Sequence, residues 1–402
     1  MMLKSIKTGT IGTIAGSGEP GCAGDGGPAT SALLNEPKNI AVDVAGNLYI
    51  VDSENHLVRK VDAQIGIMTT IAGTIVNVDP ASRPAEPLMA AYEEDEDPLA
   101  DPLSTPSDTY VQKSDLSGMV RYIGGTKSMD ERFGGDGELA TQAVLNFPSS
   151  VAVADDGTVF IADTWNHRIR KIDPQTGVIS TIAGTGQAKF YGDNGQAEKA
   201  ALNEPVALAI DANSNLLIAD QSNNRIRKID LSSGVITTIA GNGESGYNGD
   251  DILGPDAALA GPSGLALDPK GNLYVADTFS SRIRKIDRQT GLIETVLGGT
   301  SVYQFVAVQN ESSESLSRPY AIAIDANGRL FITDTDNHLI RVWDPQKKEM
   351  SLLAGIGKAE FSGDGGNPSS SSLNYPFGVA VDRQGHVYIA DTFSHRIRVV
   401  VE

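Results

Sequence analysis

The sequence predicts an all-β protein, a closed β-propeller built from four-stranded antiparallel blades. Three observations support this prediction: a repeat of 57 residues, four short strand-like runs in each repeat, and a chain start that completes the last repeat. Five prolines spaced by this period mark the repeat, and an earlier proline lies about two periods before them: Pro37, Pro148, Pro205, Pro262, Pro319 and Pro376. Internal periods of this order are typical of solenoids and propellers.

Each repeat contains four runs with strand character, most clearly in residues 205–241. The first run alternates large aliphatic residues with alanine, which is the period of a strand. The second run ends in aspartate, the third reads Arg-Ile-Arg-Lys, and the fourth reads Val-Ile-Thr-Thr-Ile-Ala-Gly. Short runs joined by tight turns predict an antiparallel sheet. Such sheets bury both faces when they are arranged around an axis, as in a propeller.

The two ends of the chain predict that the ring closes. The last repeat stops at Glu402, after its third run, while residues 8–16 match the fourth run of the other repeats. A linear solenoid would have no use for a repeat divided between the two termini. We therefore expect the N-terminal strand to complete the last blade.

The number of blades depends on the long first interval. Residues 88–92 resemble an inner strand, 110–115 a third strand and 118–125 a fourth, while the segment between them is rich in proline and carboxylates, which disrupt strands. We expect a single domain over residues 1–402 with seven blades, of which the second is degenerate and includes the divergent segment 74–118. The alternative is six blades with an insertion.

The charge of the chain limits the kinds of partner that it can bind. The chain has 32 basic and 51 acidic residues, a formal net charge of −19. This charge disfavours nucleic acids, whose binding depends on neutralising phosphates, and anionic membrane surfaces. We expect a protein, a peptide or a small neutral or cationic ligand, and a monomer by default. Cys22 is the one cysteine, so no intramolecular disulfide can form.

No run of apolar residues has the length of a membrane span. The first residues also lack the apolar stretch of a signal peptide. We therefore expect a cytoplasmic protein, unless a secretion signal has been removed.

A motif recurs where the second run passes into the third. It reads DSENHLVRK at 52–60, DTWNHRIRK at 163–171 and DTDNHLIRV at 334–342. It resembles the NHL-repeat family, which is named for Asn-His-Leu, and the linker GDGGPATSALLNEP at 24–37 is similar to that of bacterial members. The resemblance implies a β-propeller, usually with six blades. It does not select a function, because the family includes RNA-binding domains, scaffolds, a metal-dependent amidating lyase and sensor domains.

Residues that recur in every repeat are interpreted as structural. The repeated aspartates and arginines fit this description, since an aspartate at a strand end accepts hydrogen bonds from the next turn. The four histidines of the motif are related by rotation about the axis and would not converge on one ion: His56, His167, His338 and His395. His386 lies outside the motif, in a turn on the opposite face.

The linkers between blades contain a Gly-Asp-Gly segment that we expect at one mouth of the channel. No cofactor is predicted firmly, and Ca²⁺ is the one ion we consider, because it prefers oxygen ligands. The candidate carboxylates are Asp25, Asp136, Asp193, Asp250 and Asp364. The competing interpretation is that these segments are tight turns with a structural role.

Positions that depart from the repeat are the better candidates for function. Aromatic residues replace polar ones in three of the turns between the second and third runs, and others stand in a linker or at the entrances of inner strands. The candidate mouth rim comprises Trp165, Phe279, Phe393, Tyr303, Phe305, Tyr320, Phe377, Lys38 and Asn39. No motif for covalent, phosphoryl or zinc chemistry is evident. We predict a non-enzymatic interaction scaffold that uses this face. The alternative is a lyase or hydrolase at the channel mouth, possibly metal-assisted, for which no catalytic residue can be named.

Overall fold

The computed structural model describes residues 3, 6–74, 111–113, 120–122, 133–299 and 315–402. The chain divides into two compact units. The first comprises residues 1–75 and 132–402, and the second comprises residues 76–131.

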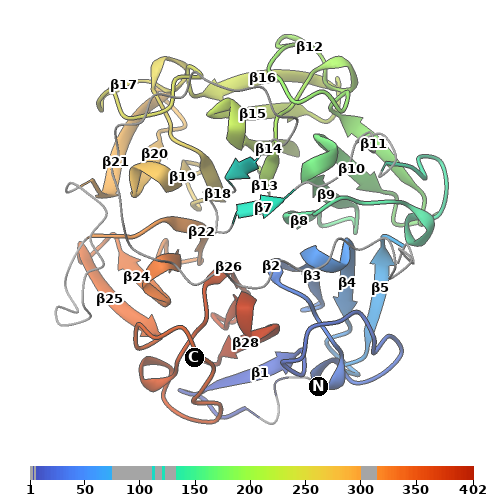
Figure 1. Ribbon diagram of the computed structural model, residues 1–402. Coiled ribbons are helices and arrows are strands. Elements are labelled where there is room, and N and C mark those ends of the chain that lie inside the picture. The colour runs from blue at the N-terminus through green and yellow to red at the C-terminus, as the bar shows by residue number, and fades with distance from the viewer. Residues whose placement is uncertain (1–2, 4–5, 75–110, 114–119, 123–132, 300–314) are drawn as a thin grey trace. The chain divides into compact units, whose positions relative to one another are not determined.

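The first unit consists of six antiparallel blades arranged around an axis, each with four main strands (Figure 1). From the innermost strand to the outermost, blade 1 comprises β2 (Pro37–Val42), β3 (Leu48–Asp52), β4 (Leu57–Val61) and β5 (Met68–Ala72). Blade 2 comprises β8 (Ser150–Val153), β9 (Val159–Asp163), β10 (Arg168–Ile172) and β11 (Ile179–Ala183). Blade 3 comprises β13 (Pro205–Ile210), β14 (Asn215–Asp220), β15 (Arg225–Asp230) and β16 (Val235–Ala240).

The other three blades repeat this order. Blade 4 comprises β18 (Pro262–Leu267), β19 (Leu273–Asp277), β20 (Arg282–Ile286) and β21 (Leu292–Gly298). Blade 5 comprises β22 (Pro319–Ile324), β23 (Leu330–Asp334), β24 (Leu339–Asp344) and β25 (Glu349–Ala354). Blade 6 comprises β26 (Pro376–Val381), β27 (Val387–Asp391), β28 (Arg396–Val400) and β1 (Ile11–Ala15). Short strands from the linkers add to the outer edges of blades 3 and 4, namely β12 (Gly195–Gln196) and β17 (Ile252–Leu253).

The helices in the described part of the first unit are single 3₁₀ turns. One set follows the second strand of each blade: η3 (Ser53–Asn55), η7 (Thr164–Asn166), η9 (Gln221–Asn223), η11 (Thr278–Ser280), η12 (Thr335–Asn337) and η14 (Thr392–Ser394). The other set lies in the linkers: η2 (Ala29–Ser31), η6 (Ala140–Gln142), η8 (Ala197–Lys199), η10 (Gly254–Asp256) and η13 (Pro368–Ser370). Within the described ranges, no helix is long and apolar enough to cross a membrane.

The N-terminal strand completes the last blade, as the sequence predicts. Strand β1 pairs antiparallel with β28, and Ile11 lies opposite Val400. The six innermost strands also form a complete circuit, because each contacts the next and β26 contacts β2. Hydrogen-bonded ladders stay within blades. Side-chain packing and single hydrogen bonds, rather than a continuous ladder, therefore hold neighbouring blades together.

The structure corrects the expected number of blades from seven to six among the described residues. Strand β2 contacts β8 directly, and the Ser53 hydroxyl donates to the Pro148 carbonyl at 2.8 Å, so no blade lies between blades 1 and 2. The predicted third and fourth strands of the degenerate blade do form strands, β6 (Val111–Lys113) and β7 (Val120–Tyr122), which pair as a two-stranded sheet in the second unit. The predicted inner strand at 88–92 lies outside the described residues.

The hydrophobic core lies in six clusters, one between each pair of neighbouring blades. The alternation in each inner strand explains this arrangement. In β13, Leu208 packs against blade 2, whereas Ala207 packs against blade 4. Each blade therefore buries both of its faces, which a four-stranded sheet cannot do alone.

Candidate binding face around the repeat prolines

The repeat prolines and the 3₁₀ turns after the second strands lie on one face of the ring. Pro205 at the start of β13 is opposite Asp220 at the end of β14, and Pro37 and Asp52 are placed in the same way. We call this face the proline face. The turns between the first and second strands of each blade lie on the opposite face, because antiparallel strands exchange ends.

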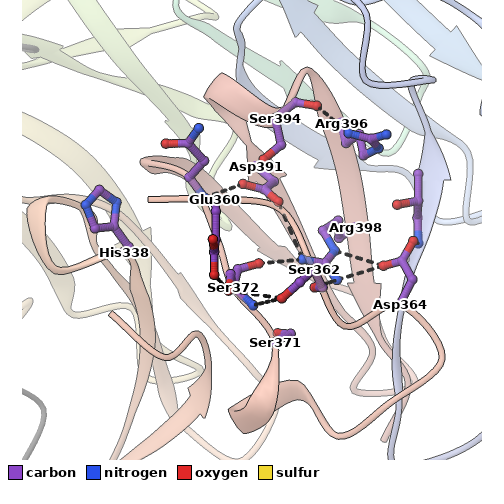
Figure 2. Close-up of polar contacts among 12 residues, drawn as sticks. His338, Glu360, Ser362, Asp364, Ser371, Ser372, Asp391, Ser394, Arg396 and Arg398 are labelled. Atoms are coloured by element: carbon purple, nitrogen blue, oxygen red, sulfur yellow. Dashed lines mark hydrogen bonds and ion pairs between the residues drawn. The ribbon is translucent and has the colours of Figure 1, made fainter. Parts of the chain in front are cut away.

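A buried network of aspartate and arginine recurs on every blade, and Figure 2 shows it in blade 6. Arg398 is fully buried, donates to Asp364 Oδ1 at 2.7 Å and to the Ser372 carbonyl at 2.8 Å, and lies 3.5 Å from Asp391. Asp391 also accepts from the Asn374 N–H at 2.7 Å. The arginine thus joins the linker to two strands of its blade, which is a structural role.

The linker aspartates considered for Ca²⁺ bind these arginines. The pairs are Asp25 with Arg59, Asp136 with Arg170, Asp193 with Arg227, Asp250 with Arg284 and Asp364 with Arg398. The linkers do not ring the mouth as expected, because Gly195 pairs with Ile236 on the outermost strand of blade 3. A cation at one of these aspartates would have to compete with a guanidinium. In the described part of the chain, no three His, Cys, Asp or Glu side chains are grouped to hold a metal ion. The calcium hypothesis stays a prediction that this geometry disfavours.

Aromatic residues ahead of these linker aspartates stack on the same arginines. The Phe190 ring lies 3.7 Å from the Arg225 guanidinium and 4.8 Å from that of Arg227, and Phe361 has the same contacts in blade 6. About two-fifths of Phe361 is exposed. These outer aromatic residues therefore brace the linkers.

The histidines of the motif join neighbouring blades. His167 Nδ1 accepts a hydrogen bond from the N–H of Glu204, the residue before the next repeat proline, at 3.1 Å. Blade 3 has the amide of Asn224 in this place, and its Oδ1 accepts from the Gly261 N–H at 2.9 Å. Burial lowers the pKa of His167 to about 4, with a smaller effect of the nearby Arg168 charge. The neutral imidazole is therefore the acceptor. The equivalent contacts are His56 to Phe147, His338 to Tyr375 and His395 to Glu36.

At five of the six repeat prolines, these contacts support an uncommon backbone conformation of the residue before the proline. The residue before each repeat proline has a positive φ between 45° and 56°, in the left-handed region. That region is unfavourable for residues other than glycine, and the residue before a proline prefers extended backbone. These residues lie beside the 3₁₀ turn of the same blade. They are Glu36, Phe147, Glu204, Gly261, Arg318 and Tyr375.

Each such residue forms what we call a rim pair with the second residue of the adjacent 3₁₀ turn. A backbone hydrogen bond links the two segments, for example from the Trp165 N–H to the Asn146 carbonyl at 3.1 Å. The rim pairs, in blade order, are Glu36 with Glu54, Phe147 with Trp165, Glu204 with Ser222, Gly261 with Phe279, Arg318 with Asp336, and Tyr375 with Phe393.

The chemistry of the rim pairs differs from blade to blade. The rings of Phe147 and Trp165 have centroids 4.0 Å apart, and those of Tyr375 and Phe393 are 5.2 Å apart. Glu204 Oε2 accepts from the Ser222 hydroxyl at 2.6 Å. Arg318 Nε lies 3.6 Å from Asp336 Oδ2. The proline face therefore carries two aromatic pairs separated by polar and charged pairs.

The structure places five of the nine predicted rim residues on three rim pairs and two inner-strand entrances of the proline face. Trp165, Phe279 and Phe393 are half-buried in rim pairs. Phe279 lies over Gly261, where an added Cβ would be 2.3 Å from its ring. Tyr320 and Phe377 are buried at neighbouring inner-strand entrances, with ring centroids 4.8 Å apart.

Lys38 occupies the same inner-strand position as Tyr320 and Phe377, and the other predicted residues lie elsewhere. Lys38 is half-buried on β2, and Asn39 Oδ1 accepts from the Val151 N–H at 3.3 Å, so Asn39 joins blades 1 and 2. Tyr303 and Phe305 lie outside the described residues.

Of the rim-pair residues, the sequence predicted Trp165, Phe279 and Phe393 alone. It missed every residue that stands immediately before a repeat proline, including Phe147, Glu204 and Tyr375. That position was the signal that could have identified them.

Six blades around an axis, with the first strand completing the last blade, define a β-propeller. The NHL-repeat model matches residues 259–286, 316–343 and 373–400, and the model of the teneurin NHL domain matches residues 8–91 and 117–191. The chain belongs to the NHL-repeat family.

Curated relatives share this repeat. The chain is 31% identical over 269 residues to protein SUPPRESSOR OF QUENCHING 1 of Arabidopsis thaliana. The aligned region covers 64% of this chain and 25% of that protein. It is 30% identical over 313 residues to NHL repeat-containing protein 2 of Gallus gallus. Here the aligned region covers 70% of this chain and 42% of that protein. The chain thus spans less than half the length of these relatives.

Solved structures share the fold at low identity. A Bacteroides thetaiotaomicron protein of unknown function has a TM-score of 0.60 at 17% identity, covering 97% of this chain and 74% of that one. A gluconolactonase from Xanthomonas campestris has a TM-score of 0.51 at 12% identity, and the match covers 91% of this chain and 86% of that one. These likenesses concern the fold alone.

Proposed function

We propose that the protein is a non-enzymatic binding module whose proline face binds a protein or peptide partner. The observation that carries this proposal is the contrast between two sets of positions. The aspartates, arginines and blade-joining residues recur around the ring, whereas the rim pairs on the same face change in size, charge and aromatic character. Variation of side chains on a repeated scaffold is the way in which repeat proteins form binding surfaces.

The chemistry of the rim pairs favours a particular kind of peptide. Aromatic side chains contribute much of the energy of protein interfaces, and they are concentrated here on blades 2 and 6. Carboxylates lie on the same face at Glu36, Glu54 and Glu204. With the net charge of −19, they attract basic partners and raise the rate of encounter. The partner we propose is therefore a peptide segment that combines aromatic or aliphatic side chains with lysine or arginine.

The test is peptide selection against the full chain, followed by affinity measurements on variants. A library displayed on phage is selected on the wild-type protein and depleted on the variant W165A/F279A/F393A. The control is I65A/L292A, which removes exposed apolar side chains at the turns between the third and fourth strands, on the opposite face. We expect selected peptides to bind the rim variant at least about ten-fold more weakly and the control as tightly as wild type.

Two results would contradict the proposal. One is a set of peptides that bind all three proteins equally. The other is turnover of a lactone such as gluconolactone by the wild type that the rim variant loses, which would favour the lyase or hydrolase alternative. Thermal unfolding of each variant shows whether it is folded.

A further inference from the structure

A pocket of about 290 Å³ lies on the face opposite the proline face, where blades 6 and 1 meet. Its size is near the lower limit of small-molecule sites. It lies between the turn after β2, the turn after β26 and residue Leu3. Its lining residues include Leu3, Asp43, Val44, Asp382, His386 and Tyr388.

A repeated hydrogen bond is missing at this pocket. In blades 1, 3 and 4, the aspartate after the first strand accepts a side-chain hydrogen bond from the asparagine four residues later. The distances are 2.8 Å from Asn47 to Asp43, 2.7 Å from Asn215 to Asp211 and 2.8 Å from Asn272 to Asp268. Arg329 supplies the same donor to Asp325 in blade 5. In blade 6 the residue is His386, and among the described residues the one side chain that donates to Asp382 Oδ2 is Tyr388, at 2.9 Å.

His386 also lacks a hydrogen-bond partner. Its Nδ1 is buried, and no residue in the described ranges forms a hydrogen bond with it. The Oδ1 atom of Asp382 accepts from the N–H groups of Gln384 and His386, and Oδ2 accepts from Tyr388, so one of about four acceptor positions of the carboxylate is left. Buried polar atoms without partners are rare and call for an explanation. A donor that enters the pocket would bond to Asp382 Oδ2, and it would reach His386 Nδ1 once rotation of the imidazole ring turns that buried atom towards the pocket.

The lining indicates the class of that donor. Asp43 and Asp382 bring two carboxylates to the pocket and disfavour an anion. The cationic lining residue Arg383 has a side chain that is 75% exposed and lies 3.9 Å from Asp155 of blade 2. Leu3, Val44, Ala45 and Ala63 supply an apolar wall that suits an alkyl group. A metal ion fits less well, because no three acidic, His or Cys side chains in the described part of the chain are grouped to hold one.

We propose that this pocket binds a small aliphatic ammonium ion, which donates N–H hydrogen bonds to Asp382 Oδ2 and, after rotation of the imidazole ring, to His386 Nδ1. An ammonium group has three donors, so one group can serve both acceptors. Its alkyl part lies against Leu3 and Val44. This site is independent of the peptide-binding role of the proline face.

The proposal is tested by calorimetric titration of the full chain with n-butylammonium chloride near neutral pH, together with ¹⁵N NMR of the His386 ring. Tetramethylammonium, a cation without N–H groups, is the matched ligand. We expect saturable binding of butylammonium with a shift of the His386 nitrogen signals, and no such shift with tetramethylammonium. The variant H386N restores the asparagine of blades 1, 3 and 4. It should bind butylammonium at least about ten-fold more weakly without a lower melting temperature. The variant H338N, on the other face, should bind like wild type.

Any of the following outcomes would overturn the proposal. Equal binding by H386N and wild type would place the amine elsewhere. Equal binding of tetramethylammonium would show that charge alone is recognised. Folded wild-type protein that shows no saturable heat with butylammonium, or that responds only to ZnCl₂, would exclude an ammonium site.

Discussion

His395 of the last blade accepts at Nδ1 a hydrogen bond from the backbone N–H of Glu36 in the first blade, at 3.2 Å. The same contact joins His167 to Glu204 within the chain, where the two residues are 37 positions apart. The closure of the ring therefore uses the contact that also joins blades 1 and 2, blades 2 and 3, and blades 5 and 6. A protonated imidazole cannot accept this hydrogen bond, because both nitrogens then carry hydrogen.

Acid should therefore weaken the ring through its histidines. Burial lowers the pKa of His167 from 6.5 to about 4, and it lowers the pKa values of His338 and His395 as well. Because the unfolded chain binds the extra proton first, the stability contributed by neutral His167 is complete above about pH 6.5 and is lost as the pH falls towards 4. The shift corresponds to roughly 3 kcal/mol.

The variant H167N isolates this effect, since Asn224 shows that an amide can replace the imidazole. Urea unfolding at pH 7.5 and pH 4.5 should show that the variant loses less stability than wild type on acidification. The buried aspartates act in the opposite direction, because burial raises the pKa of Asp220 to about 6. They are common to both proteins and cancel in the comparison. If H167N and wild type lost the same unfolding free energy between pH 7.5 and pH 4.5, the prediction would be contradicted.

Removing a buried arginine should destabilise the blade strongly. Arg227 is fully buried between Asp220, at 3.2 Å, and Asp193, at 2.6 Å. The substitution R227M leaves the carboxylate of Asp220 without its cation, and breaking a buried pair in this way typically costs about 3–5 kcal/mol. The matched variant D193N changes a side chain that is 26% exposed and should cost less. Urea unfolding measures both. A larger loss in D193N would show that the linker, rather than the buried pair, carries the stability.

The sequence was sufficient to predict the propeller, its four-stranded blades and the closure by β1, because these features follow from a period and from the two chain ends. The number of blades was predicted wrongly. The number of blades depends on whether residues 76–131 supply an inner strand between β2 and β8. A degenerate repeat has no sequence pattern from which this packing can be predicted. The position of the linker aspartates was also missed. A linker that leaves the outermost strand of one blade continues along the outer edge of the next, as Gly195 does on β16.

The candidate binding face was predicted only in part for a similar reason. Trp165, Phe279 and Phe393 depart visibly from a repeated polar position. Their neighbours Phe147 and Tyr375 lie beside them on the face with a left-handed backbone conformation before a proline. A sequence pattern does not show that conformation, since the residue before a proline ordinarily prefers extended backbone.

The rim pair of blade 4 should be energetically coupled. Gly261 has φ of 56°, and an added Cβ would be 2.3 Å from the Phe279 ring. The substitution G261A should therefore cost about 1–3 kcal/mol, as expected for overpacking. In the F279A background the cost should be smaller, because the ring is gone and only the backbone strain remains. A double-mutant cycle in urea unfolding measures this coupling. Additive effects of the two substitutions would show that Phe279 moves away freely.

Replacing residues 76–131 with a flexible Gly-Ser linker should leave the six-bladed ring folded. The prediction rests on the direct contacts between blades 1 and 2, which include the hydrogen bonds from the Ser53 hydroxyl to Pro148 and from the Phe147 N–H to His56. None of these contacts uses the replaced residues, so we expect a cooperative thermal transition and an unchanged β-sheet circular dichroism spectrum. The matched control removes residues 1–16, and with them β1, whose Ile11 and Ile14 are almost fully buried. That truncation exposes the edge of β28 and should lower the melting temperature or cause aggregation. If the linker variant unfolded as readily as the truncated chain, the inserted unit would have to be a structural part of the ring, and the count of six independent blades would be wrong.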